Sequence, residues 1–489
     1  MDLLLAAAHN GEKPTFPPEA DTLEYAKLLD SQDKISHLRD QFNIPTKGSL
    51  LKKALDGTIP GDTKQNGNIN PEDDTTTPSI YFVGNSLGAQ PKSVQSHVSA
   101  QLETWASIGV NGHFTSLGNS PLSAAWQDLA ESCAKKSVDL VGASIPEEVI
   151  YMNTLTVNLH LMLAAFYKPT TKRHKIIIEW RPFPSDWYAV QSQISLHGFT
   201  VEESLVEIQP DDREGSKSLY LSTERILAAI DEHADATAVL LLPGVQYFTG
   251  QVLDIPTITR YAQQRGIVVG WDLAHAAGNI PLRLHDWGVD FAVWCTYKYL
   301  NAGPGATAGL FLHEKHHDKI QEGEVKGRLA GWYGADKRVR FNMEKEFVPS
   351  PGAWGYQLSN PSGIDLSCLS ATLSVFGMTG MKELRGKSVV LTGYLEWLLL
   401  KVLAEEEGNK KGVFRILTPE RVEERGAQLS LMFKSKEVLE RVGKELTEKG
   451  VVFDVRRPDV IRVAPVPLYC SFEDVWRFVQ VLKGAIAEL

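Results

Sequence analysis

The sequence predicts an α/β protein with a large, mostly parallel β-sheet and a smaller α+β domain near the C-terminus. Between Glu148 and Leu312, apolar strand-like runs alternate with amphipathic stretches of helical period. After about Cys368 this alternation gives way to long helices around short strands. A chain of 489 residues also exceeds what one hydrophobic core usually supports. Together these observations predict at least two domains.

The predicted sheet is carried by continuous apolar runs that are separated by helices. The strand-like runs are Lys175–Glu179, Ala238–Leu242, Ile267–Trp271 and Phe291–Cys295. Amphipathic stretches at Ser222–Glu232 and Ile255–Arg265 predict the helices between them. Strands that are apolar on both faces and alternate with helices are typical of a parallel sheet covered on both sides. A ligand site is then expected outside the carboxyl ends of the strands.

The N-terminal and C-terminal parts of the chain are expected to contain different secondary structure. Met1–His9 and Asp21–Leu55 are expected to be helical, and Gly57–Pro78, rich in Gly, Pro, Asn, Asp and Thr, predicts a flexible loop. The C-terminal part is expected to contain helices at Leu369–Leu403 and Ser435–Lys449, with strands at Gln428–Phe433 and Val460–Val463. We therefore expect an N-terminal helical segment with a loop over residues 1–79, a large domain over 80–365 and a small domain over 366–489.

Composition excludes several classes of function. The net charge of −10, with no Lys/Arg-rich stripe to offset it, argues against nucleic-acid binding. No apolar run approaches the roughly 20 residues of a membrane span. The four cysteines lie far apart and form no CxxC pair, so neither a disulfide framework nor a metal site is expected. The expected location is the cytoplasm, where thiols stay reduced.

Polar residues with distinct chemistry follow two of the predicted strands. Asp272 ends one strand and His275 comes three residues later, whereas Lys298 follows the next strand and enters a Gly/Pro-rich turn. Burial at such a position favours the neutral, nucleophilic amine, which suits a Schiff base with an aldehyde cofactor. A carboxylate nearby would hold a pyridine nitrogen protonated, the partnership expected for pyridoxal 5′-phosphate. The alternative is that Asp272 caps a helix and Lys298 is a solvated surface residue.

Two further segments fit the same cofactor. Leu155 and Thr156 open an apolar helix, where amides and a hydroxyl could bind a phosphate, although a plain helix cap would look the same. The turn Phe183–Asp186 (Phe183, Pro184, Ser185 and Asp186) offers an aromatic ring for stacking and a second carboxylate. Its alternative reading is a proline turn with buried aromatic side chains.

At the level of longer motifs the sequence resembles the kynureninase family. The matching runs are Phe82–Gly88, Thr154–His160, Phe183–Asp186, Tyr247–Gln251, Trp271–Ala276, Trp294–Asn301 and Arg462–Tyr469. The resemblance extends from about Ile80 to the end of the chain. It implies the fold-type-I architecture of pyridoxal-phosphate enzymes, which is similar to that of aspartate aminotransferase. It also implies a homodimer.

The resemblance assigns roles to individual residues. The implied catalytic residues are Lys298 as the Schiff-base lysine, Asp272 as the partner of the pyridinium, and Tyr297. The implied cofactor contacts are Leu155, Thr156, Phe183, Pro184, Ser185, Asp186, Asp272, His275, Tyr297, Lys298, Trp332 and Asn360. The implied substrate contacts are Ser86, His113, Asn360 and Arg462, with the arginine binding the α-carboxylate. Trp332 and Asn360 would act across the dimer interface.

The family's reaction is the hydrolysis of L-kynurenine to anthranilate and L-alanine, or of 3-hydroxy-L-kynurenine to 3-hydroxyanthranilate and L-alanine. This chemistry belongs to tryptophan catabolism and to the synthesis of NAD. The alternative is an enzyme similar to cysteine desulfurase or selenocysteine lyase, which needs a nucleophilic cysteine on a loop above the cofactor. Cys295, Cys368 and Cys470 are poorly placed for that task, because each is expected in or near a core element.

Overall fold

The computed structural model divides the chain into two compact units. It describes residues 1–59, 76–210, 212–213, 216–217, 219–317, 328–407 and 412–489. One unit, here called the sheet unit, contains Ser93–Tyr247 and Val252–Met378. The other, called the terminal unit, contains Met1–Lys92, Phe248–Gln251 and Thr379–Leu489. Their boundaries differ from the predicted ones after residues 79 and 365, because the N-terminal segment belongs with the C-terminal residues.

The sheet unit is built around seven strands in the order β4-β12-β11-β10-β9-β5-β6. Their bounds are β4 Val149–Tyr151, β12 Gly309–Leu312, β11 Phe291–Trp294, β10 Val268–Asp272, β9 Thr237–Pro243, β5 Lys175–Glu179 and β6 Leu205–Ile208. Strand β12 is antiparallel to both neighbours, and all other neighbouring pairs are parallel. The buried residues of the central strands leave no polar face. The predicted α/β fold with a mostly parallel sheet is therefore confirmed.

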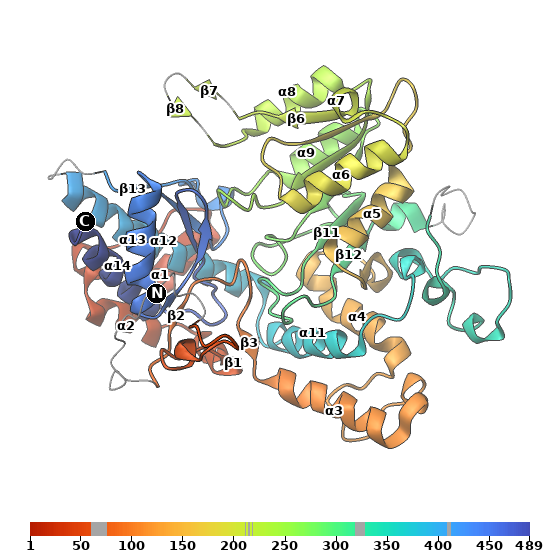
Figure 1. Cartoon of the computed structure of the whole chain (residues 1–489), viewed down its shortest axis with the longest axis horizontal. Helices are drawn as coiled ribbons and strands as arrows, with labels where there is room; N and C mark the ends of the chain where they lie inside the picture. The colour runs from red at the N-terminus through yellow and green to blue at the C-terminus, as the bar shows by residue number, and fades with distance from the viewer. Residues whose placement is uncertain (60–75, 211, 214–215, 218, 318–327, 408–411) are drawn as a thin grey trace. The chain divides into compact units, whose positions relative to one another are not determined.

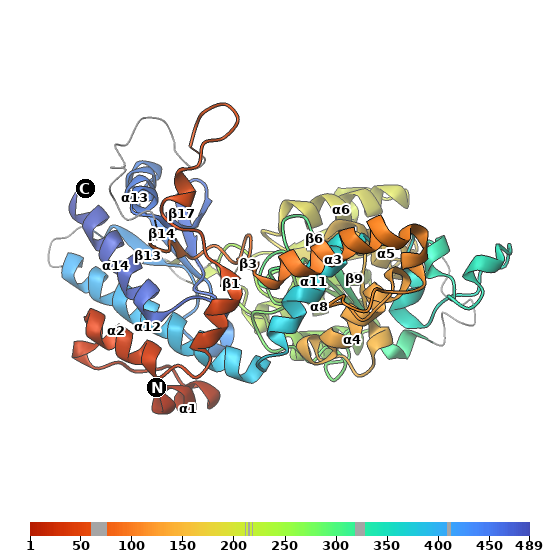
Figure 2. The ribbon, with the colours of Figure 1, turned by 90° about the horizontal axis from the view of Figure 1, so that it is seen from below.

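Helices cover both faces of this sheet, as Figures 1 and 2 show from two directions. Helices α5 (Leu155–Phe166) and α6 (Pro184–Leu196) lie on one face, and α8 (Thr223–His233) and α9 (Ile255–Gln263) lie on the other. The chain runs outward from β5 to β6 and then in the opposite direction from β9 to β10. Adjacent strands β5 and β9 therefore form a topological switch point, where open α/β sheets bind ligands.

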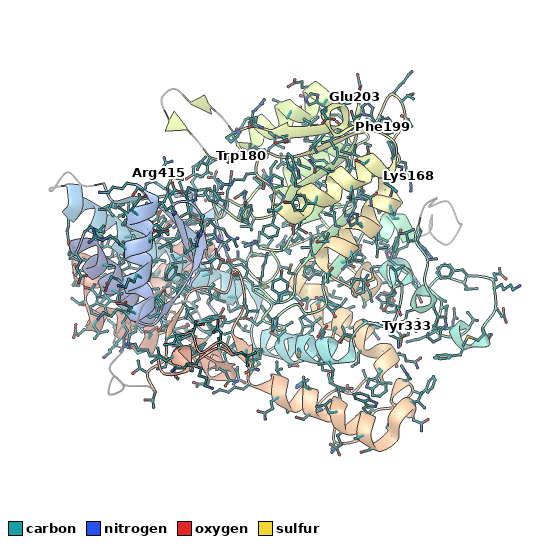
Figure 3. All side chains as sticks on the ribbon, in the orientation of Figure 1. Lys168, Trp180, Phe199, Glu203, Tyr333 and Arg415 are labelled. Carbon is teal, nitrogen blue, oxygen red and sulfur yellow. The ribbon has the colours of Figure 1, made fainter. Side chains whose placement is uncertain are left out.

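The remaining elements of the sheet unit complete its periphery. They are α3 (Ser93–Ile108), α4 (Leu129–Val141), α7 (Val201–Ser204), α11 (Gly363–Phe376) and the short strands β7 (Asp212–Arg213) and β8 (Ser216–Lys217). Helices α3 and α4 both pack against α11. Near the β6 end, Phe199 stacks on His174 with ring centroids 4.9 Å apart (Figure 3). Because His174 precedes β5 and Phe199 precedes α7, this contact joins the segments that lead into β5 and β6.

The terminal unit is a four-stranded antiparallel sheet with helices. Its strands follow the order β13-β14-β17-β16, with bounds β13 Phe414–Ile416, β14 Leu429–Phe433, β17 Val460–Val463 and β16 Asp454–Arg456. Its helices are α1 Asp2–His9, α2 Leu23–Ser31, α12 Met381–Glu407, α13 Lys436–Glu448 and α14 Phe472–Ala487. Strand β2 (Ile80–Tyr81) pairs in parallel with β15 (Val451–Val452), and β1 (Phe42–Asn43) pairs with β3 (Gln90–Pro91). The first β pairing joins the N-terminal and C-terminal parts of the chain.

Two predicted helices are wrong in extent. The helix expected over Asp21–Leu55 ends at Ser31, because the Asp33 carboxylate accepts the N–H of Ile35 at 3.1 Å and closes a turn instead. The helix expected over Leu369–Leu403 is two helices, α11 and α12. They are separated by the segment that contains Gly377 and Gly380, and glycine disfavours a helix interior. The loop predicted over Gly57–Pro78 falls largely outside the described residues.

Among the described residues, no single helix is both long enough and apolar enough to cross a membrane. The consecutive helices α11 and α12 meet that requirement of length and composition only when they are taken together as a bent pair. Most of α11 is buried inside the sheet unit, as expected for a core helix.

Candidate active site

A cavity of about 290 Å³ opens at the carboxyl ends of β5, β9, β10 and β11. This is the side of the sheet on which the switch point between β5 and β9 places a ligand. The lining residues are Thr154, Leu155, Thr156, Ile178, Glu179, Pro182, Phe183, Ser185, Asp186, Leu241, Leu242, Pro243, Val245, Tyr247, Asp272, Ala274, His275, Cys295, Tyr297, Lys298, Gly305, Ala306 and Ala308. All of them belong to the sheet unit. The strand ends that the sequence singled out therefore do converge.

Lys298 is held in the cavity by a tightly bonded turn. The backbone N–H of Asn301 donates to the Lys298 carbonyl at 2.9 Å, and Asn301 has a left-handed φ of 55°. The Thr296 hydroxyl donates to the carbonyl of Thr307 at 2.6 Å, which ties the turn to the next strand. A non-glycine residue with positive φ stores strain that the surrounding bonds must outweigh. The turn thus aims the buried Lys298 amine into the cavity, where Nζ lies 3.1 Å from Nε2 of His275.

Three carboxyl groups gather in the same cavity. Asp272 ends β10 and accepts the N–H of Ala274 at 2.7 Å, so it closes a local turn and caps no helix. Burial, and next the charge of Asp272, raise the pKa of Asp186 well above its usual range. Burial also raises the pKa of Glu179 to about 8, although Gln246 donates to both of its oxygens at 3.2 and 3.3 Å. The cavity therefore holds more carboxyl groups than it can ionise without a further cationic partner.

Two helix N-termini point their first turns at the cavity. Helix α5 begins at Leu155 and helix α6 begins at Pro184, and neither is capped by a side-chain hydrogen bond. The free N–H groups of a first helical turn, together with the helix dipole, favour an anion. The hydroxyls of Thr156 and Ser185, one from each helix, contact each other directly. The sequence analysis left a plain helix cap open as the alternative, but α5 has no side-chain hydrogen bond at its cap.

Aromatic side chains form the walls of the cavity. The Phe183 ring centroid lies 5.6 Å from Nζ of Lys298 and meets the Tyr247 ring edge-on at 5.4 Å. Burial, followed by the neighbouring Cys295, raises the pKa of Tyr297. Tyr297 therefore keeps its phenolic proton at neutral pH and can donate it.

These groups fit pyridoxal 5′-phosphate. The buried Oδ1 of Asp186 accepts no hydrogen bond from any described residue, and a protonated ring nitrogen beside Asp186 and Asp272 would supply the missing cation. The two uncapped helix N-termini and their hydroxyls suit a phosphate. Phe183 is placed to stack on a planar ring, and Lys298 is the available amine.

Six of the predicted site residues do not line this cavity. His113, Trp332 and Asn360 lie elsewhere in the sheet unit, and Ser86 and Arg462 belong to the terminal unit. Pro184 starts α6 beside the cavity without lining it. In the terminal unit Arg462 is fully buried on β17, and its Nε donates to Asp454 at 2.9 Å.

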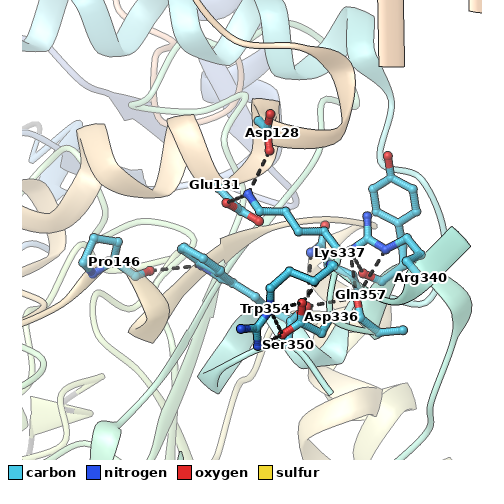
Figure 4. A network of polar contacts seen from close by, with 12 residues as sticks. Asp128, Glu131, Pro146, Asp336, Lys337, Arg340, Ser350, Trp354 and Gln357 are labelled. Carbon is cyan, nitrogen blue, oxygen red and sulfur yellow. Dashed lines mark hydrogen bonds and ion pairs between the residues drawn. The ribbon is translucent and has the colours of Figure 1, made fainter. Parts of the chain in front are cut away.

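The segment that carries Trp332 is anchored by the polar network in Figure 4. Lys337 Nζ lies 2.9 Å from both Asp128 and Glu131 at the start of α4. The Trp354 indole donates to the carbonyl of Pro146, as Figure 4 shows. It also donates to the carbonyl of Val149, which ties the segment to β4. Trp332 itself donates to the carbonyl of Arg340 at 3.0 Å and remains exposed. The exposed indole is thus presented on a fixed support.

Among the lining residues to which the sequence analysis gave no role, Glu179 adds a carboxyl group and Tyr247 adds a phenol. A charged residue at the last position of the buried strand β5 was the signal available for Glu179. Tyr247 lies beyond the end of β9 and begins the family-like run Tyr247–Gln251, which was the signal available for it.

The cysteines do not provide the nucleophile that the alternative reading requires. Burial raises the thiol pKa of Cys133 to about 12, and it also raises the pKa values of Cys295, Cys368 and Cys470. A thiol that keeps its proton is a poor nucleophile. Cys295 lines the cavity but lies immediately after β11, on the sheet and not on a loop above it.

Comparisons with known proteins identify the family that this chain resembles. Residues 80–340 match the family described as aminotransferase class-V, and residues 384–482 match the kynureninase C-terminal domain. Kynureninase 1 of Neurospora crassa is 61% identical over 98% of this chain and 97% of its own length. Kynureninase of Pyricularia oryzae is 56% identical over 96% of each chain.

Among solved structures, a cysteine desulfurase from Thermococcus onnurineus has a TM-score of 0.64 at 15% identity, covering 84% of this chain and 95% of that one. A structure of C-DES, with glycine linked to its PLP cofactor, has a TM-score of 0.63 at 16% identity, covering 83% of this chain and 96% of that one. At such low identity these two likenesses establish the fold alone. The full-length relatives at 56% and 61% identity establish more: this chain belongs to the kynureninase family.

Proposed function

We propose that the protein hydrolyses L-kynurenine to anthranilate and L-alanine, and 3-hydroxy-L-kynurenine to 3-hydroxyanthranilate and L-alanine, as a step of tryptophan catabolism. The observation that carries this proposal is the cavity that joins Lys298, His275 and three carboxyl groups to two uncapped helix N-termini. Full-length relatives named kynureninase support the choice of reaction.

Pyridoxal 5′-phosphate is the cofactor of this reaction, and the lining residues divide its binding among themselves. The amides of Leu155 and Thr156, with the hydroxyl of Ser185, would bind the phosphate. Asp272, with Asp186 beside it, would hold the ring nitrogen protonated, and Phe183 would stack on the ring. Once bound, the cofactor supplies an electron sink for negative charge that develops on the substrate's α-carbon.

The side chains around the cofactor would move the protons. Lys298 would carry the cofactor at rest and, once displaced by the substrate's amine, take the α-proton on Nζ. His275, 3.1 Å from that nitrogen, would position the amine between these tasks. Tyr297, which keeps its proton, would donate it from the phenolic oxygen to the carbon that becomes the methyl group of alanine. One water is consumed, and its oxygen ends in the carboxylate of the aromatic product.

Substrate recognition would involve the predicted residues outside the cavity lining. Arg462 would bind the α-carboxylate, a task that suits the planar guanidinium. Asp454 supports this role, because its hydrogen bond at 2.9 Å fixes the orientation of the Arg462 side chain on β17. Ser86, His113 and Asn360 would contact the aromatic part of the substrate.

We also propose that the protein is a homodimer in which Trp332 and Asn360 complete the pocket of the partner subunit. The support is an exposed aromatic cluster: Phe341 lies 5.2 Å from Phe114 and 5.5 Å from Trp332, ring centroid to ring centroid. All three rings are exposed in the single chain. Contiguous exposed aromatic surface of this kind is typical of a protein–protein interface. The anchored support of Trp332 would hold the cluster rigid before association.

A cytoplasmic location is part of the proposal. Its support is that all four cysteines are free thiols, three of them buried, as is usual in a reducing compartment.

The decisive experiment incubates the purified protein, loaded with cofactor, with each of the two substrates. Fluorescence of the aromatic product and release of alanine in equal amounts are expected. The variant Lys298→Ala should lose the visible absorbance of the bound cofactor and at least about 10⁴-fold of the rate, because attachment and base are lost together. The exposed Lys168→Ala serves as the control and should keep both. Sulfide release from cysteine without kynurenine hydrolysis would overturn the proposal.

The dimer is tested separately by sedimentation of the cofactor-loaded protein. A mass of two chains is expected, and the double variant F114A/F341A should shift the population toward single chains. The distant, exposed Tyr188→Ala is the control for loss of surface aromatic area. A single chain that hydrolyses kynurenine at full rate would contradict the proposed exchange of Trp332 and Asn360.

A further inference from the structure

A second cluster of ionisable side chains lies at the other ends of the sheet strands, on the side of the seven-stranded sheet away from the cavity. Glu148 immediately precedes β4, His313 immediately follows the antiparallel strand β12, and His285 lies in the connection that leads to β11. One ligand atom from each residue lies within 4.8 Å of the other two. The Glu148 carboxylate is fully buried, whereas the two imidazoles reach the surface in part. The cluster is thus closed from the sheet side and open to solvent on the other.

Two histidines lie beside the buried carboxylate of Glu148. Among the described residues, the basic groups within ion-pair distance of this carboxylate are Nδ1 of His285 at 2.8 Å and Nδ1 of His313 at 3.7 Å. The backbone N–H of Lys315 donates to Nδ1 of His313 at 3.1 Å, so this nitrogen bears no proton and the imidazole is neutral. The Lys315 ammonium is itself paired with Asp290 at 2.7 Å. Glu148 is therefore held by hydrogen bonds, including those from the N–H groups of Ser144 and Glu314, and has no Lys or Arg partner within ion-pair distance among the described residues.

The hydrogen bonds of His313 determine which of its nitrogens bears the proton. Nε2 lies 3.1 Å from the carbonyl oxygen of His285, so in the neutral ring this nitrogen is the donor. Nδ1 accepts the N–H of Lys315 at 3.1 Å and therefore bears a lone pair. That lone pair and the Glu148 oxygen, 3.7 Å away, are two electron donors with no proton between them. A cation placed there would remove the repulsion.

The surrounding bonds resemble those that orient metal ligands. A ligating histidine usually donates its second N–H to a carbonyl, and a ligating carboxylate is itself hydrogen-bonded. His313 makes the first kind of bond to His285, and Glu148 Oε2 accepts the N–H of Ser144 at 2.7 Å. Two histidines and one carboxylate, with a side open to water, form the ligand set of a four-coordinate Zn²⁺ site. Without an ion, Glu148 Oε1 accepts hydrogen bonds from His285 Nδ1 and from the N–H of Glu314, both at 2.8 Å.

We propose that Glu148, His285 and His313 bind one divalent transition-metal ion of the Zn²⁺ class, with water as the fourth ligand. The ion takes the place of the Nδ1 proton of His285, which leaves to solvent. The backbone N–H of Lys315 then donates to water instead of to Nδ1 of His313. The bound ion joins the start of β4, the end of β12 and the connection before β11. Its role is to hold together the edge of the sheet that lies away from the reaction.

The test titrates Zn²⁺ into the cofactor-loaded protein, after treatment with a chelator and its removal, by isothermal titration calorimetry. One ion per chain is expected, with an affinity that falls at least tenfold in His285→Gln and in His313→Gln. His233→Gln is the matched control, because that side chain is 23% exposed, close to the 28% of His285, and also lies beside one carboxylate. It should leave the affinity unchanged. The cofactor's absorbance should not move during the titration, since an ion in the cavity would perturb it.

Titration of the unaltered protein with Co²⁺ keeps the proposal testable even where a variant fails to fold. One equivalent should produce the intense visible bands of four-coordinate Co²⁺. A weak six-coordinate spectrum, an affinity unchanged in both histidine variants, or no binding at all would overturn the proposal.

Discussion

The two edges of the seven-stranded sheet bury the same kinds of side chain but balance their charges differently. At the carboxyl edge, burial raises the pKa values of Asp186 and Glu179, so these carboxyl groups tend to remain protonated. At the opposite edge, burial also acts on Asp290, but hydrogen bonds from His316 and Lys315 outweigh it and lower its pKa to about 2. The cavity therefore has acids without a charge partner, whereas Asp290 is matched within the fold.

This difference separates the binding edge from the supporting edge. Asp290 also accepts hydrogen bonds from the Gln263 side chain and the N–H of Val269, so its polar atoms are used within the fold. In the cavity, Asp186 has a buried oxygen with no partner among the described residues. Unmatched buried charge destabilises a fold unless a ligand completes it, so its presence indicates a functional site. The predictions below test this contrast, beginning with the largest expected effect.

Replacing Asp272 should have the largest effect. In Asp272→Asn the acceptor for the Ala274 N–H is kept, but the negative charge beside the ring nitrogen is lost. We expect kcat for kynurenine to fall on the order of 10²–10³-fold, as for other losses of preorganised charge. Steady-state kinetics and the absorbance of the bound cofactor measure it. Asp290→Asn is the control at the other edge and should keep the spectrum; retention of over a tenth of the rate by Asp272→Asn would contradict the assignment.

The supporting edge should respond in stability instead of turnover. The folded pKa of Asp290, about 2, is below its ordinary value of 3.8, so its ionised form stabilises the fold. This contribution, about 2 kcal/mol in full, is present above pH 4 and is lost as the pH falls toward 2. Asp290→Asn should therefore lower the free energy of unfolding at pH 7, and less so near pH 3. Denaturant titrations measure it, with the exposed Asp286→Asn as control; an equal loss at both pH values would refute the sign.

A smaller effect is expected at the helix N-termini. Thr156→Ala removes one hydroxyl from the proposed phosphate site, and the affinity for the cofactor should fall about tenfold, the usual loss of one hydrogen bond to a charged group. Titration of the cofactor-free protein with pyridoxal 5′-phosphate, followed by absorbance, gives this ratio. Thr156→Ser keeps the hydroxyl and should restore most of the affinity. Failure of serine to rescue would indicate a packing role.

The smallest effect on turnover is expected at Glu179. Because its pKa is raised to about 8, the buried acid is largely uncharged at pH 7, and Glu179→Gln should change kcat by less than about threefold. In the cofactor-free protein, the pKa of Glu179 is 4.5 in the unfolded chain and about 8 in the folded one. The stability of the unaltered protein should therefore fall as the pH rises from 4.5 to about 8. The variant should lack this decline. Thermal unfolding of both proteins at pH 5, 7 and 9 measures this decline. The same dependence of the melting temperature on pH in both proteins would contradict the prediction.

Much of the sheet and half of the site follow from the sequence by local rules. Strand β5 has the bounds that its apolar run predicts, and β9, β10 and β11 differ from prediction by about one residue at an end. Lys298, Asp272 and His275 could be grouped because the carboxyl ends of parallel strands lie at one edge. Each of these inferences needs only a pattern within a dozen residues and one rule of sheet topology.

The tertiary structure alone decided what depends on pairs distant in the chain. Strand β2 joins β15 across some 370 residues, which places the N-terminal segment in the terminal unit. Glu148 contacts His285 across 137 residues, at an edge where no strand-end rule directs attention. The order of strands sets such distances, and that order depends on the packing of the whole sheet. The sequence by itself determined which side chains could react. The tertiary structure decided at which ends of the strands the buried carboxyl groups lack a charge partner.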